Sequence, residues 1–577
     1  MTELARQLWM ILRISFFNLA NSRNVLLCIV VLLFELGSIP VSVRLIQWTA
    51  DFYGALERFD GPEAARQVGI YALLIAAYAG LALAGGYLRK FLIMRWRQDL
   101  TENILTDWLT DKTYWRLQNG YGVEKIDNPD QRIAEDCRLF VEEFVNETLG
   151  LITSLTGLFT YIAVLWSLSN FPLEFTLLDW QVAIPRYMVW AAFLYVLLSS
   201  GLTHWLGYPL KGLTFNQQRK EANFRFDLVR LRENADPVAV SGFEAAERRR
   251  LDGKFDAIVA NWKRLILREF YLGCFKIPYF RTILRIPLLL ALPAYFAGHV
   301  NFGGLMQLAS AFQRVVTTLS WFIFAYNRLA ALAATISRLG DLLDAIATCK
   351  NAPASEIIVT NHEDETIEVR GLALESPVGK PLQIPANWDF KPGEHVWISG
   401  PSGLGKSTFL KTLADIWPYG QGEVHIPEGK SCAFIPQRST INGTGLAESA
   451  IYPLEEGSIS LAATADYLAA VGLPDQAHAL QAEKNPDISG FSGGELQRLA
   501  LVRLLIEKPD WVFMDEASSA IDSKSEAEIF TRLRARLPDT TFIIVAHRPP
   551  GGFDALRHIP LFPDPETPFI SLPTEGK

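Results

Sequence analysis

One run of eight residues has the composition and spacing of a loop that binds nucleotide phosphates. It reads Gly-Pro-Ser-Gly-Leu-Gly-Lys-Ser and occupies positions 400–407. In such a loop the glycines let backbone N–H groups converge on the phosphates, Lys406 places a charge near the β- and γ-phosphates, and the Ser407 hydroxyl can ligate Mg²⁺. The predicted phosphate contacts are Gly400, Pro401, Ser402, Gly403, Leu404, Gly405, Lys406, Ser407 and Thr408.

The residues on either side fit the context that this motif requires, a strand before the loop and a helix after it. Residues 395–399 are typical of a buried strand, and residues 408–413 are typical of a helix. The match therefore predicts an α/β domain that binds a nucleoside triphosphate.

Three further strand-like runs each finish on a polar side chain. Gln437 follows residues 432–436, the Asp515-Glu516 pair follows residues 511–514, and His547 follows residues 542–546. Open α/β sheets bind ligands at the carboxyl ends of their strands. There Asp515 can hold Mg²⁺, Glu516 can polarise the attacking water, and His547 can contact the γ-phosphate. Each pattern is ordinary alone, but together with Lys406 they predict a hydrolytic site.

A second glycine-containing segment, Phe-Ser-Gly-Gly-Glu-Leu-Gln-Arg at 491–498, opens a helix that continues to Leu505. A helix N-terminus is a site for an anion. A chain with this segment and a phosphate loop resembles the ATP-binding cassette (ABC) superfamily, in which the segment is the signature motif. The resemblance implies these ATP or Mg²⁺ contacts: Ser492, Gly493, Gly494 and Glu495 of the signature, Gln437 of the Q-loop, and Asp522 of the D-loop, with Ser407, Gln437 and Asp515 around the metal.

The same resemblance makes His547 the switch histidine and implies a dimer. In this superfamily two cassettes sandwich two ATP molecules between the phosphate loop of one and the signature of the other. A chain with one cassette is therefore expected to be a half-transporter that pairs with a second copy of itself.

Other segments narrow the resemblance to bacterial YddA-type transporters, which are relatives of the SbmA/BacA peptide and vitamin B12 importers and of peroxisomal subfamily D. They are residues 128–136, 302–307, 311–312, 319–322, 436–438 and 451–453. The resemblance places residues 128–136 in a cytoplasmic loop that carries force, with a second such loop near 234–244. The chain departs from the family pattern in two places. No aromatic residue for stacking adenine occurs near 375–377, and the signature carries Phe491 and Glu495 where Leu and Gln are more usual.

The first part of the chain is apolar enough to lie in a membrane. Half of the 577 residues are hydrophobic, and the mean hydropathy is +0.15. A bilayer requires about 20 apolar residues per helix, and six windows meet this length: 24–46, 67–87, 148–170, 183–207, 277–299 and 305–331. We therefore expect an α-helical membrane domain of six helices, exporter-like, at 1–347, a linker at 348–365, and an α/β cassette at 366–577.

Lys and Arg gather in the second-to-third and fourth-to-fifth connections, which the positive-inside bias places in the cytoplasm with both termini. The first window is longer than a secretory core and no convincing cleavage site follows it, so we expect it to be retained. Residues 8–17 before it are typical of a helix lying along the inner leaflet.

Ionisable residues within the apolar windows are expensive and usually face protein or water. Those singled out as a possible solute path are Glu35, Arg281, Arg285 and Arg314, with His204 a weaker candidate. Arg281 and Arg285 would share a face of one continuous helix and would favour an anionic solute. The alternative is that Arg281 reaches the headgroups and that Glu35 pairs with one of these arginines.

Composition argues against several other classes. The net charge of −8 gives no reason to expect nucleic acid, and five scattered cysteines indicate neither a disulfide framework nor a zinc site. We expect ATP-driven transport across a bacterial inner membrane, with uptake of peptides or hydrophilic solutes such as cobalamin. The alternatives are acyl-CoA, lipid or drug translocation or export, a peroxisomal membrane, and a nontransporting membrane ATPase that regulates a partner.

Overall fold

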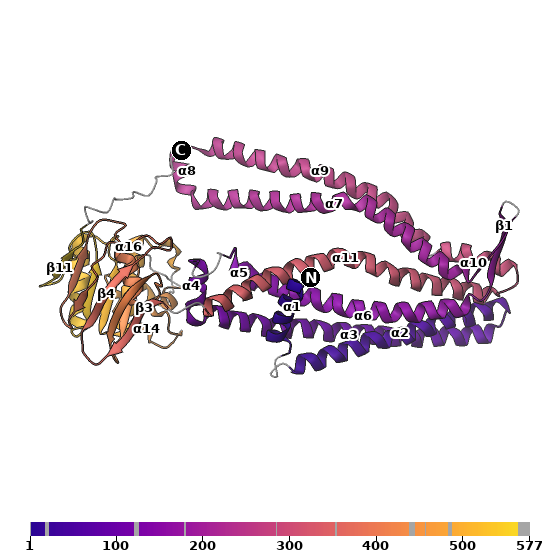
Figure 1. The fold of residues 1–577 in the computed structure, drawn as a ribbon, viewed down its shortest axis with the longest axis horizontal. Helices are drawn as coiled ribbons and strands as arrows, with labels where there is room; N and C mark the ends of the chain where they lie inside the picture. The colour runs from indigo at the N-terminus through magenta and orange to yellow at the C-terminus, as the bar shows by residue number, and fades with distance from the viewer. Residues whose placement is uncertain are drawn as a thin grey trace. The chain divides into compact units, whose positions relative to one another are not determined.

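The computed structural model describes residues 2–17, 22–120, 126–177, 180–283, 285–351, 355–437, 445–455, 457–482 and 487–562. Contacts divide the chain into two compact units (Figure 1). Unit 1 comprises residues 1–113 and 126–347, and unit 2 comprises residues 114–125 and 348–577.

Unit 1 is built almost entirely from long helices. Its elements are α1 (Thr2–Ser15), α2 (Ser22–Glu57), α3 (Gly61–Leu109), η2 (Thr110–Lys112), α5 (Pro129–Gln131), η3 (Arg132–Asp136), α6 (Cys137–Leu168), β1 (Pro172–Leu177), β2 (Trp180–Pro185), α7 (Tyr187–Glu233), α8 (Ala235–Ser241), α9 (Glu244–Thr282), α10 (Ile286–Phe296) and α11 (Phe302–Lys350, whose last residues enter unit 2).

Among the residues that the structure describes, four helical stretches are long and apolar enough to cross a membrane: Ser22–Glu57, Gly61–Gln118, Pro129–Leu168 and Tyr187–Glu233. They contain the first four predicted windows almost entirely. The fifth window falls on α9 and the short apolar helix α10. The sixth window falls on α11, which is not among the four stretches that are long and apolar enough to cross a membrane. A helical membrane region is thus confirmed, and six crossings stay a prediction.

Two local expectations in this region are wrong. The fourth window was expected to be helical from Ala183, but Ala183 lies in strand β2, which pairs antiparallel with β1. The fifth window was expected to be continuous, but α9 ends at Thr282 and α10 begins at Ile286. Pro287 lies in the first turn of α10, where its fixed φ and missing N–H are tolerated.

A close backbone approach joins α2 and α11 at one end of the unit. A Cβ atom on Gly303 would lie 2.4 Å from the Ala50 carbonyl oxygen and 2.9 Å from the Gly54 nitrogen. The Phe302 N–H donates to a Glu57 carboxylate oxygen at 3.1 Å. The start of α11 is therefore fixed beside the end of α2.

The N-terminal helix α1 packs against α3 and α11. The Trp96 indole N–H donates to the buried Ser15 hydroxyl at 2.9 Å, and Arg6 forms a 2.6 Å ion pair with Asp344. Trp9 and Phe17 remain 58% and 53% exposed. Exposed aromatic side chains on a docked helix suit the expected position at a membrane surface, which stays a prediction.

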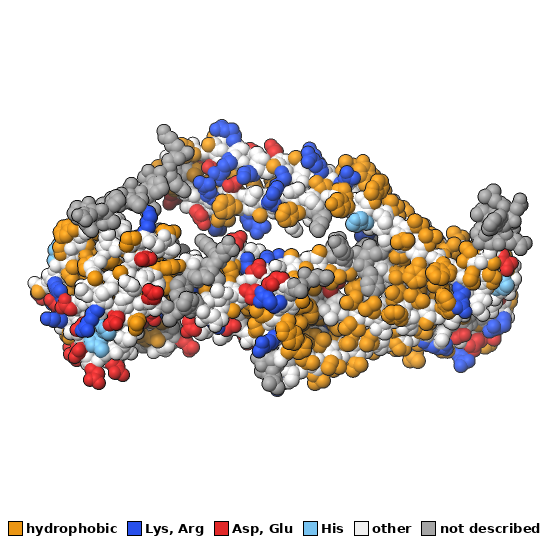
Figure 2. All heavy atoms as spheres, in the orientation of Figure 1, with side chains coloured by type: hydrophobic (Ala, Val, Ile, Leu, Met, Phe, Trp, Pro, Cys, Tyr) orange, Lys and Arg blue, Asp and Glu red, His pale blue; other side chains and the backbone are white. Residues whose placement is uncertain are grey.

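Helices α7 and α9 form a pair joined by α8, and in Figure 1 the α8 end of this pair lies away from α2, α3, α6 and α11. Lys and Arg side chains gather over this part of the molecule in Figure 2. Large apolar side chains on the pair are also exposed, among them Trp205, Tyr208, Phe215, Phe226, Trp262 and Phe270.

Unit 2 contains two sheets and the helices that cover them. Its strands are β3 (Glu356–His362), β4 (Ile367–Leu374), β5 (Trp388–Phe390), β6 (Val396–Ser399), β7 (Gly420–Pro427), β8 (Cys432–Ile435), β9 (Trp511–Asp515), β10 (Thr541–Val545) and β11 (Arg557–Pro560). Its helices are α4 (Thr113–Gln118, from Tyr114 on), α12 (Lys406–Leu413), α13 (Leu446–Ile451), α14 (Leu461–Ala470), α15 (Pro474–Gln481), η4 (Ile488–Gly490), α16 (Gly493–Glu507) and α17 (Ser523–Arg536).

The larger sheet has the strand order β11-β6-β10-β9-β8, and all of its pairs are parallel. The four strands expected from sequence are confirmed as β6, β8, β9 and β10. Strands β9 and β10 are buried along almost their whole length, as expected for the centre of a parallel sheet covered on both faces.

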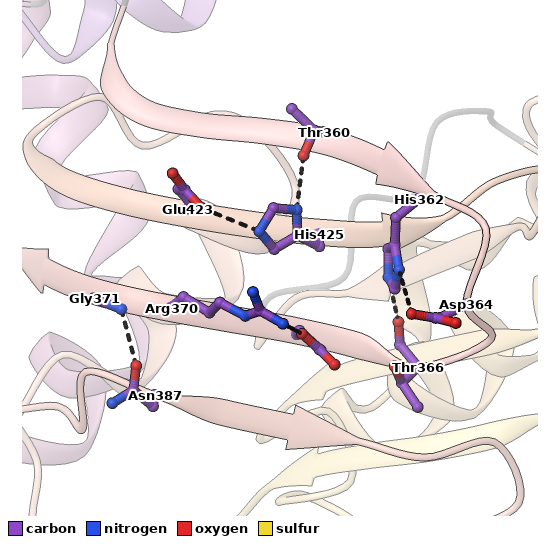
Figure 3. Close-up of polar contacts among 10 residues, drawn as sticks. Thr360, His362, Asp364, Thr366, Arg370, Gly371, Asn387, Glu423 and His425 are labelled. Carbon is purple, nitrogen blue, oxygen red and sulfur yellow. Dashed lines mark hydrogen bonds and ion pairs between the residues drawn. The ribbon is translucent and has the colours of Figure 1, made fainter.

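The smaller sheet has the order β3-β7-β4-β5. Part of the segment expected to be a linker, Glu356–His362, forms its strand β3. Figure 3 shows the polar contacts on this sheet, where the His425 ring bonds Thr360 Oγ1 at 2.9 Å and lies 3.3 Å from a Glu423 carboxylate oxygen. The Thr360–His425 contact joins β3 to β7, and the Glu423 contact lies within β7.

A short segment from the connection between the second and third predicted spans belongs to unit 2. The Trp115 ring on α4 lies 6.5 Å from the Trp417 ring, and the Arg116 guanidinium donates to the Cys349 carbonyl at 3.4 Å. The segment highlighted by family resemblance, residues 128–136, lies in unit 1 instead, where Asp136 pairs with Arg338 at 2.7 Å. The part of this connection that packs with the cassette is therefore α4.

Candidate functional site

The order of the parallel strands brings the predicted site residues to one edge of the larger sheet. Strands β6, β10, β9 and β8 are neighbours, and they end at Ser399, Val545, Asp515 and Ile435. The phosphate loop follows β6, Asp515 is the last residue of β9, and Glu516, Gln437 and His547 follow their own strands by one or two positions. Parallel pairing therefore gathers residues that lie more than 100 positions apart in the sequence.

The phosphate loop is folded around its own lysine. Lys406 Nζ donates to the Gly400 carbonyl at 2.6 Å and to the Pro401 carbonyl at 2.8 Å. Burial lowers the pKa of Lys406, while the charges of Glu516 and Asp515 act in the opposite direction. Gly405 precedes α12 with φ +106°, a conformation that L side chains rarely adopt. The loop thus leads directly into a helix N-terminus, which favours phosphate.

The carboxylate of Glu516 is held between two side chains. Gln437 Nε2 donates to Glu516 Oε2 at 2.9 Å, and His547 Nε2 lies 3.0 Å from Glu516 Oε1. Glu516 itself has φ +48°, and its N–H donates to the Val545 carbonyl at 2.9 Å. A non-glycine residue in this region stores backbone strain, which proteins usually retain at functional positions. The carboxylate is positioned to accept a proton from a water molecule.

Asp515 and Ser407 fit the requirements of a magnesium site. Burial raises the pKa of Asp515, and a hydrogen bond from Ser407 together with the charges of Lys411 and Lys406 counteracts this. A half-buried carboxylate next to a hydroxyl is an oxygen donor set of the kind that Mg²⁺ binds beside nucleotide phosphates. The Gln437 side-chain nitrogen donates to Glu516, so the Gln437 side-chain oxygen, Oε1, is the atom that can bind a cation.

The signature segment forms a complete capping box at the start of α16. Ser492 caps the helix, its N–H donates to Glu495 Oε2 at 2.8 Å, and the Glu495 N–H donates to Ser492 Oγ at 3.3 Å. These bonds from Ser492 lower the pKa of Glu495. The glutamate at this position, a departure noted in the sequence, therefore stabilises the turn of its own chain.

Two residues that the sequence reasoning missed connect this segment and the switch histidine to the D-loop. Gln497 Oε1 accepts the Ala520 N–H at 2.8 Å, and its amide donates to Ser519 Oγ at 3.2 Å. Arg548 donates to the Ile521 carbonyl at 2.9 Å and pairs at 3.2 Å with Glu526, which is 3% exposed. In the sequence, the only indication of these contacts was position: Gln497 lies within the signature segment, and Arg548 comes directly after His547.

The two tryptophans near the phosphate loop already stack on rings of their own chain. Trp388 is buried and stacks on Phe409 at 4.4 Å, while Trp397 stacks on His558 at 4.0 Å. The hairpin beside the phosphate loop offers aliphatic groups instead: a Cβ on Gly405 would lie 3.1 Å from Leu382 Cβ. An aliphatic platform for the base is consistent with the missing aromatic residue.

The four residues singled out for a solute path lie in different surroundings. Glu35 accepts from Thr153 at 3.1 Å and pairs with Arg89 at 3.3 Å, so none of the three expected arginines is its partner. Arg281 and Arg285 do not share a helix face, because α9 ends between them. Arg314 lines a cavity between α2, α3 and α11. The weaker candidate, His204, is exposed on α7.

A helical membrane unit, a P-loop sheet domain and a signature helix together define an ATPase of the ABC transporter class. Family models agree: one described as ABC transporter transmembrane region 2 matches residues 11–294, and one described as ABC transporter matches residues 385–519. The chain belongs to the ABC transporter family, whose ATP hydrolysis is coupled to transport, and the cassette binds ATP.

Particular relatives support the narrower resemblance. The chain is 33% identical to the inner membrane ABC transporter ATP-binding protein YddA of Escherichia coli (strain K12), over 92% of each chain. It is 26% identical to the chloroplastic ABC transporter D family member 2 of Arabidopsis thaliana, over 89% of this chain and 80% of that one. It is also 26% identical to the lysosomal cobalamin transporter ABCD4 of Mus musculus, over 92% and 91%. The expected kinship with YddA and the D family is confirmed.

A solved structure shares the fold. The structure of a bacterial Atm1-family ABC exporter with ATP bound matches with a TM-score of 0.66 and 17% identity, covering 91% of this chain and 92% of that one. At this identity the likeness shows the fold alone, and the exporter-like architecture expected from the sequence is confirmed.

Replacing Glu516 by Gln tests the assignment of the general base. The amide keeps the size of the side chain but cannot accept the proton of water, so we expect ATP hydrolysis to fall about 100-fold or more while ATP binding is retained. Phosphate release and binding of radiolabelled ATP by the purified protein measure the two effects. Glu528→Gln, an exposed residue of α17, is the matched control, and normal turnover by Glu516→Gln would contradict the assignment.

Replacing Arg548 by Gln tests its role in positioning the D-loop. We expect kcat to fall several-fold with unchanged ATP affinity, because the guanidinium no longer holds the Ile521 carbonyl. The variant also leaves the buried Glu526 carboxylate without its partner, which lowers stability. The double variant Arg548→Gln/Glu526→Gln should recover thermal stability but not kcat. Recovery of both would show that the arginine only neutralises Glu526.

Proposed function

We propose that two copies of this chain form a transporter that uses Mg²⁺ and ATP to move a solute across a bacterial inner membrane. One observation carries the proposal: the hydrolysis residues meet at one sheet edge of a chain that also contains apolar helices of membrane-spanning length. Kinship with an inner membrane protein of Escherichia coli supports the location.

The hydrolysis step follows from the arrangement around Glu516. Backbone N–H groups of the loop and Lys406 bind the β- and γ-phosphates. Glu516, oriented by Gln437 and His547, accepts a proton from the attacking water. His547 keeps its contact with Glu516 in this step, and its ring is proposed to contact the γ-phosphate as well. Mg²⁺, held by Ser407, Asp515 and Gln437, would neutralise charge on the phosphates.

The exposed faces of α7 and α9 support a partner made of a second copy. Trp205, Tyr208 and Trp262 are 73%, 72% and 51% exposed, although tryptophan is usually well buried. Within a lipid bilayer such side chains are stable, but toward α8 the pair carries many basic residues, which places this end in the cytoplasm, where lipid does not cover its exposed apolar side chains. A second copy can cover these helices, and the cytoplasmic placement of both termini follows from the same basic residues.

For the solute, we propose uptake of a peptide or of a hydrophilic molecule such as cobalamin, and cobalamin is the one of these that the names of relatives support. Two relatives are named as lysosomal cobalamin transporters. Acyl-CoA or a lipid is the alternative solute. This alternative comes from the resemblance to subfamily D, and a D-family member is among the relatives. A membrane ATPase that gates a partner without moving a solute is the alternative of another class.

Reconstitution in sealed vesicles separates these functions. Purified protein is reconstituted in vesicles preloaded with labelled peptides, cobalamin or acyl-CoA, and Mg²⁺-ATP is added outside, so that only transporters with outward-facing cassettes are active. Uptake into the cytoplasm corresponds to release from these vesicles, and we expect one hydrophilic solute to be released and to stimulate hydrolysis. The Glu516→Gln protein serves as the inactive control.

Two results would contradict the proposal. Stimulated hydrolysis without movement of any solute would favour the nontransporting ATPase. Movement of solute from outside into vesicles whose cassettes face outward would show export.

A further inference from the structure

A cavity of about 400 Å³ lies in unit 1 between α2, α3 and α11. Its wall from α11 consists of Ser310, Gln313, Arg314 and Thr317, and its wall from α2 includes Ser42, Ile46 and Thr49. Each set is spaced three or four residues apart, so each lies on one face of its helix. Trp48, Tyr71 and Ile75 complete the lining, together with Leu45.

The depth of the cavity places it inside the apolar part of the unit. At about 1.5 Å per residue, Arg314 lies roughly 18 Å along α11 from Phe302, and Tyr71 lies roughly 15 Å along α3 from Gly61. The end of α2 and the start of α11 meet, since Phe302 bonds Glu57. The six expected crossings imply that Phe302 and Gly61 stand at the membrane surface; in a hydrocarbon core about 30 Å thick, this depth is then near the middle, too far for Arg314 to extend its charge to the headgroups.

Arg314 has no counter-ion among the residues that the structure describes. No carboxylate lines the cavity. The acidic side chains of α2 and of the first turn of α3 are used elsewhere: Glu35 pairs with Arg89, Asp51 with Arg44, Glu57 with the Phe302 N–H, and Glu63 with Arg66 and Gln67. An arginine at this depth is expensive unless it is paired or faces water. Its counter-ion is therefore expected from outside the chain.

Three hydroxyl groups in the wall are already used by their own helices. Thr49 donates to the Leu45 carbonyl at 3.0 Å, Ser310 to the Met306 carbonyl at 3.0 Å, and Thr317 to the Gln313 carbonyl at 2.9 Å. The donors that can serve an anion in the cavity are the charged Arg314 guanidinium and, beside it, the Gln313 amide and the hydroxyls of Ser42 and Tyr71. Together they match a carboxylate.

The opposite part of the lining is aromatic and rigid. The Trp48 ring lies 4.5 Å from the Tyr71 ring and stacks on Phe52 at 5.1 Å, and its N–H donates to the Gln67 carbonyl at 2.7 Å. The indole is thus fixed in orientation with its polar atom satisfied. A fixed aromatic surface favours a planar or apolar group on a ligand.

We propose that this cavity is a solute-binding site that holds a carboxylate on Arg314 and a planar apolar group against Trp48 and Tyr71. The proposal rests on the proposed transport function and adds a chemical class to its cargo: an amphiphilic monoanion, or the acidic end of a larger solute. A cavity of this size holds a molecule as large as an acylated aromatic amino acid.

Equilibrium binding of two matched probes tests the site without ATP. Full-length protein in phosphatidylcholine nanodiscs is titrated with tritiated N-acetyl-tryptophan, which carries a carboxylate, and with N-acetyl-tryptophanamide, which does not. We expect the acid to bind at least about ten-fold more tightly than the amide, as for one charge-assisted contact. Equal binding, or no binding of this acid and of other aromatic acids, would overturn the proposal.

Variants assign the preference to Arg314. Arg314→Gln should remove the preference for the acid, Arg314→Lys should keep part of it, and Arg44→Gln, which changes a cation of α2 outside the cavity, should leave it unchanged. In case Arg314→Gln does not fold, Thr317→Glu provides an internal counter-ion three residues from Arg314 and should also remove the preference. Thr317→Gln is its control for size. A preference that survives Arg314→Gln or Thr317→Glu would overturn the proposal.

A further comparison distinguishes a solute from a lipid headgroup and this proposal from the transport function. If phosphatidylglycerol in the nanodiscs abolishes acid binding in the native protein, the site holds an anionic headgroup and the proposal is wrong. Vesicle transport without any preference for the acid would overturn this proposal alone. Binding through Arg314 without any vesicle transport would overturn the transport function alone.

Discussion

The carboxylate of Glu516 depends on two partners that come from different strands, Gln437 after β8 and His547 after β10. This arrangement is possible only because β8, β9 and β10 are parallel neighbours whose carboxyl ends lie at one edge. The same edge receives the phosphate loop from β6. A change in strand order or register would therefore separate the proton acceptor from the phosphates, even if every motif remained in the sequence.

The membrane unit follows a different electrostatic pattern. Several charges in or near its apolar helices are matched within the chain: Glu35 with Arg89, Glu147 with Arg328, and Asp136 with Arg338. Arg314 combines two features: none of the described residues supplies its counter-ion, and it lines a cavity. A charge that the fold leaves unmatched at this depth is the feature that connects the helices to a solute.

The sequence was sufficient for the cassette because its signals are local and directional. A buried run followed by Asp515-Glu516 or His547 predicts both a strand and the end at which its chemistry lies. Contacts between distant segments carry no such signal, so the bonds of Arg548 to the D-loop and of Gln497 to Ala520 were missed. Hydropathy located the apolar helices but did not predict the break before Pro287. It also did not predict the hairpin β1–β2, because a mostly apolar run of residues is compatible with a helix as well as with strands.

The account requires that one chain's phosphate loop be completed by the signature of another, and mixing two inactive variants tests this most directly. Lys406→Ala removes the phosphate contact, and Gly493→Asp adds a negative charge at a position where a side chain meets only the Ala520 Cβ at 3.9 Å within its own chain. The account predicts negligible ATP hydrolysis by either variant alone and partial recovery when the two are coexpressed and co-purified as a mixed dimer, because one intact composite site remains. Full activity of Gly493→Asp alone, or no recovery in the mixed dimer, would contradict it.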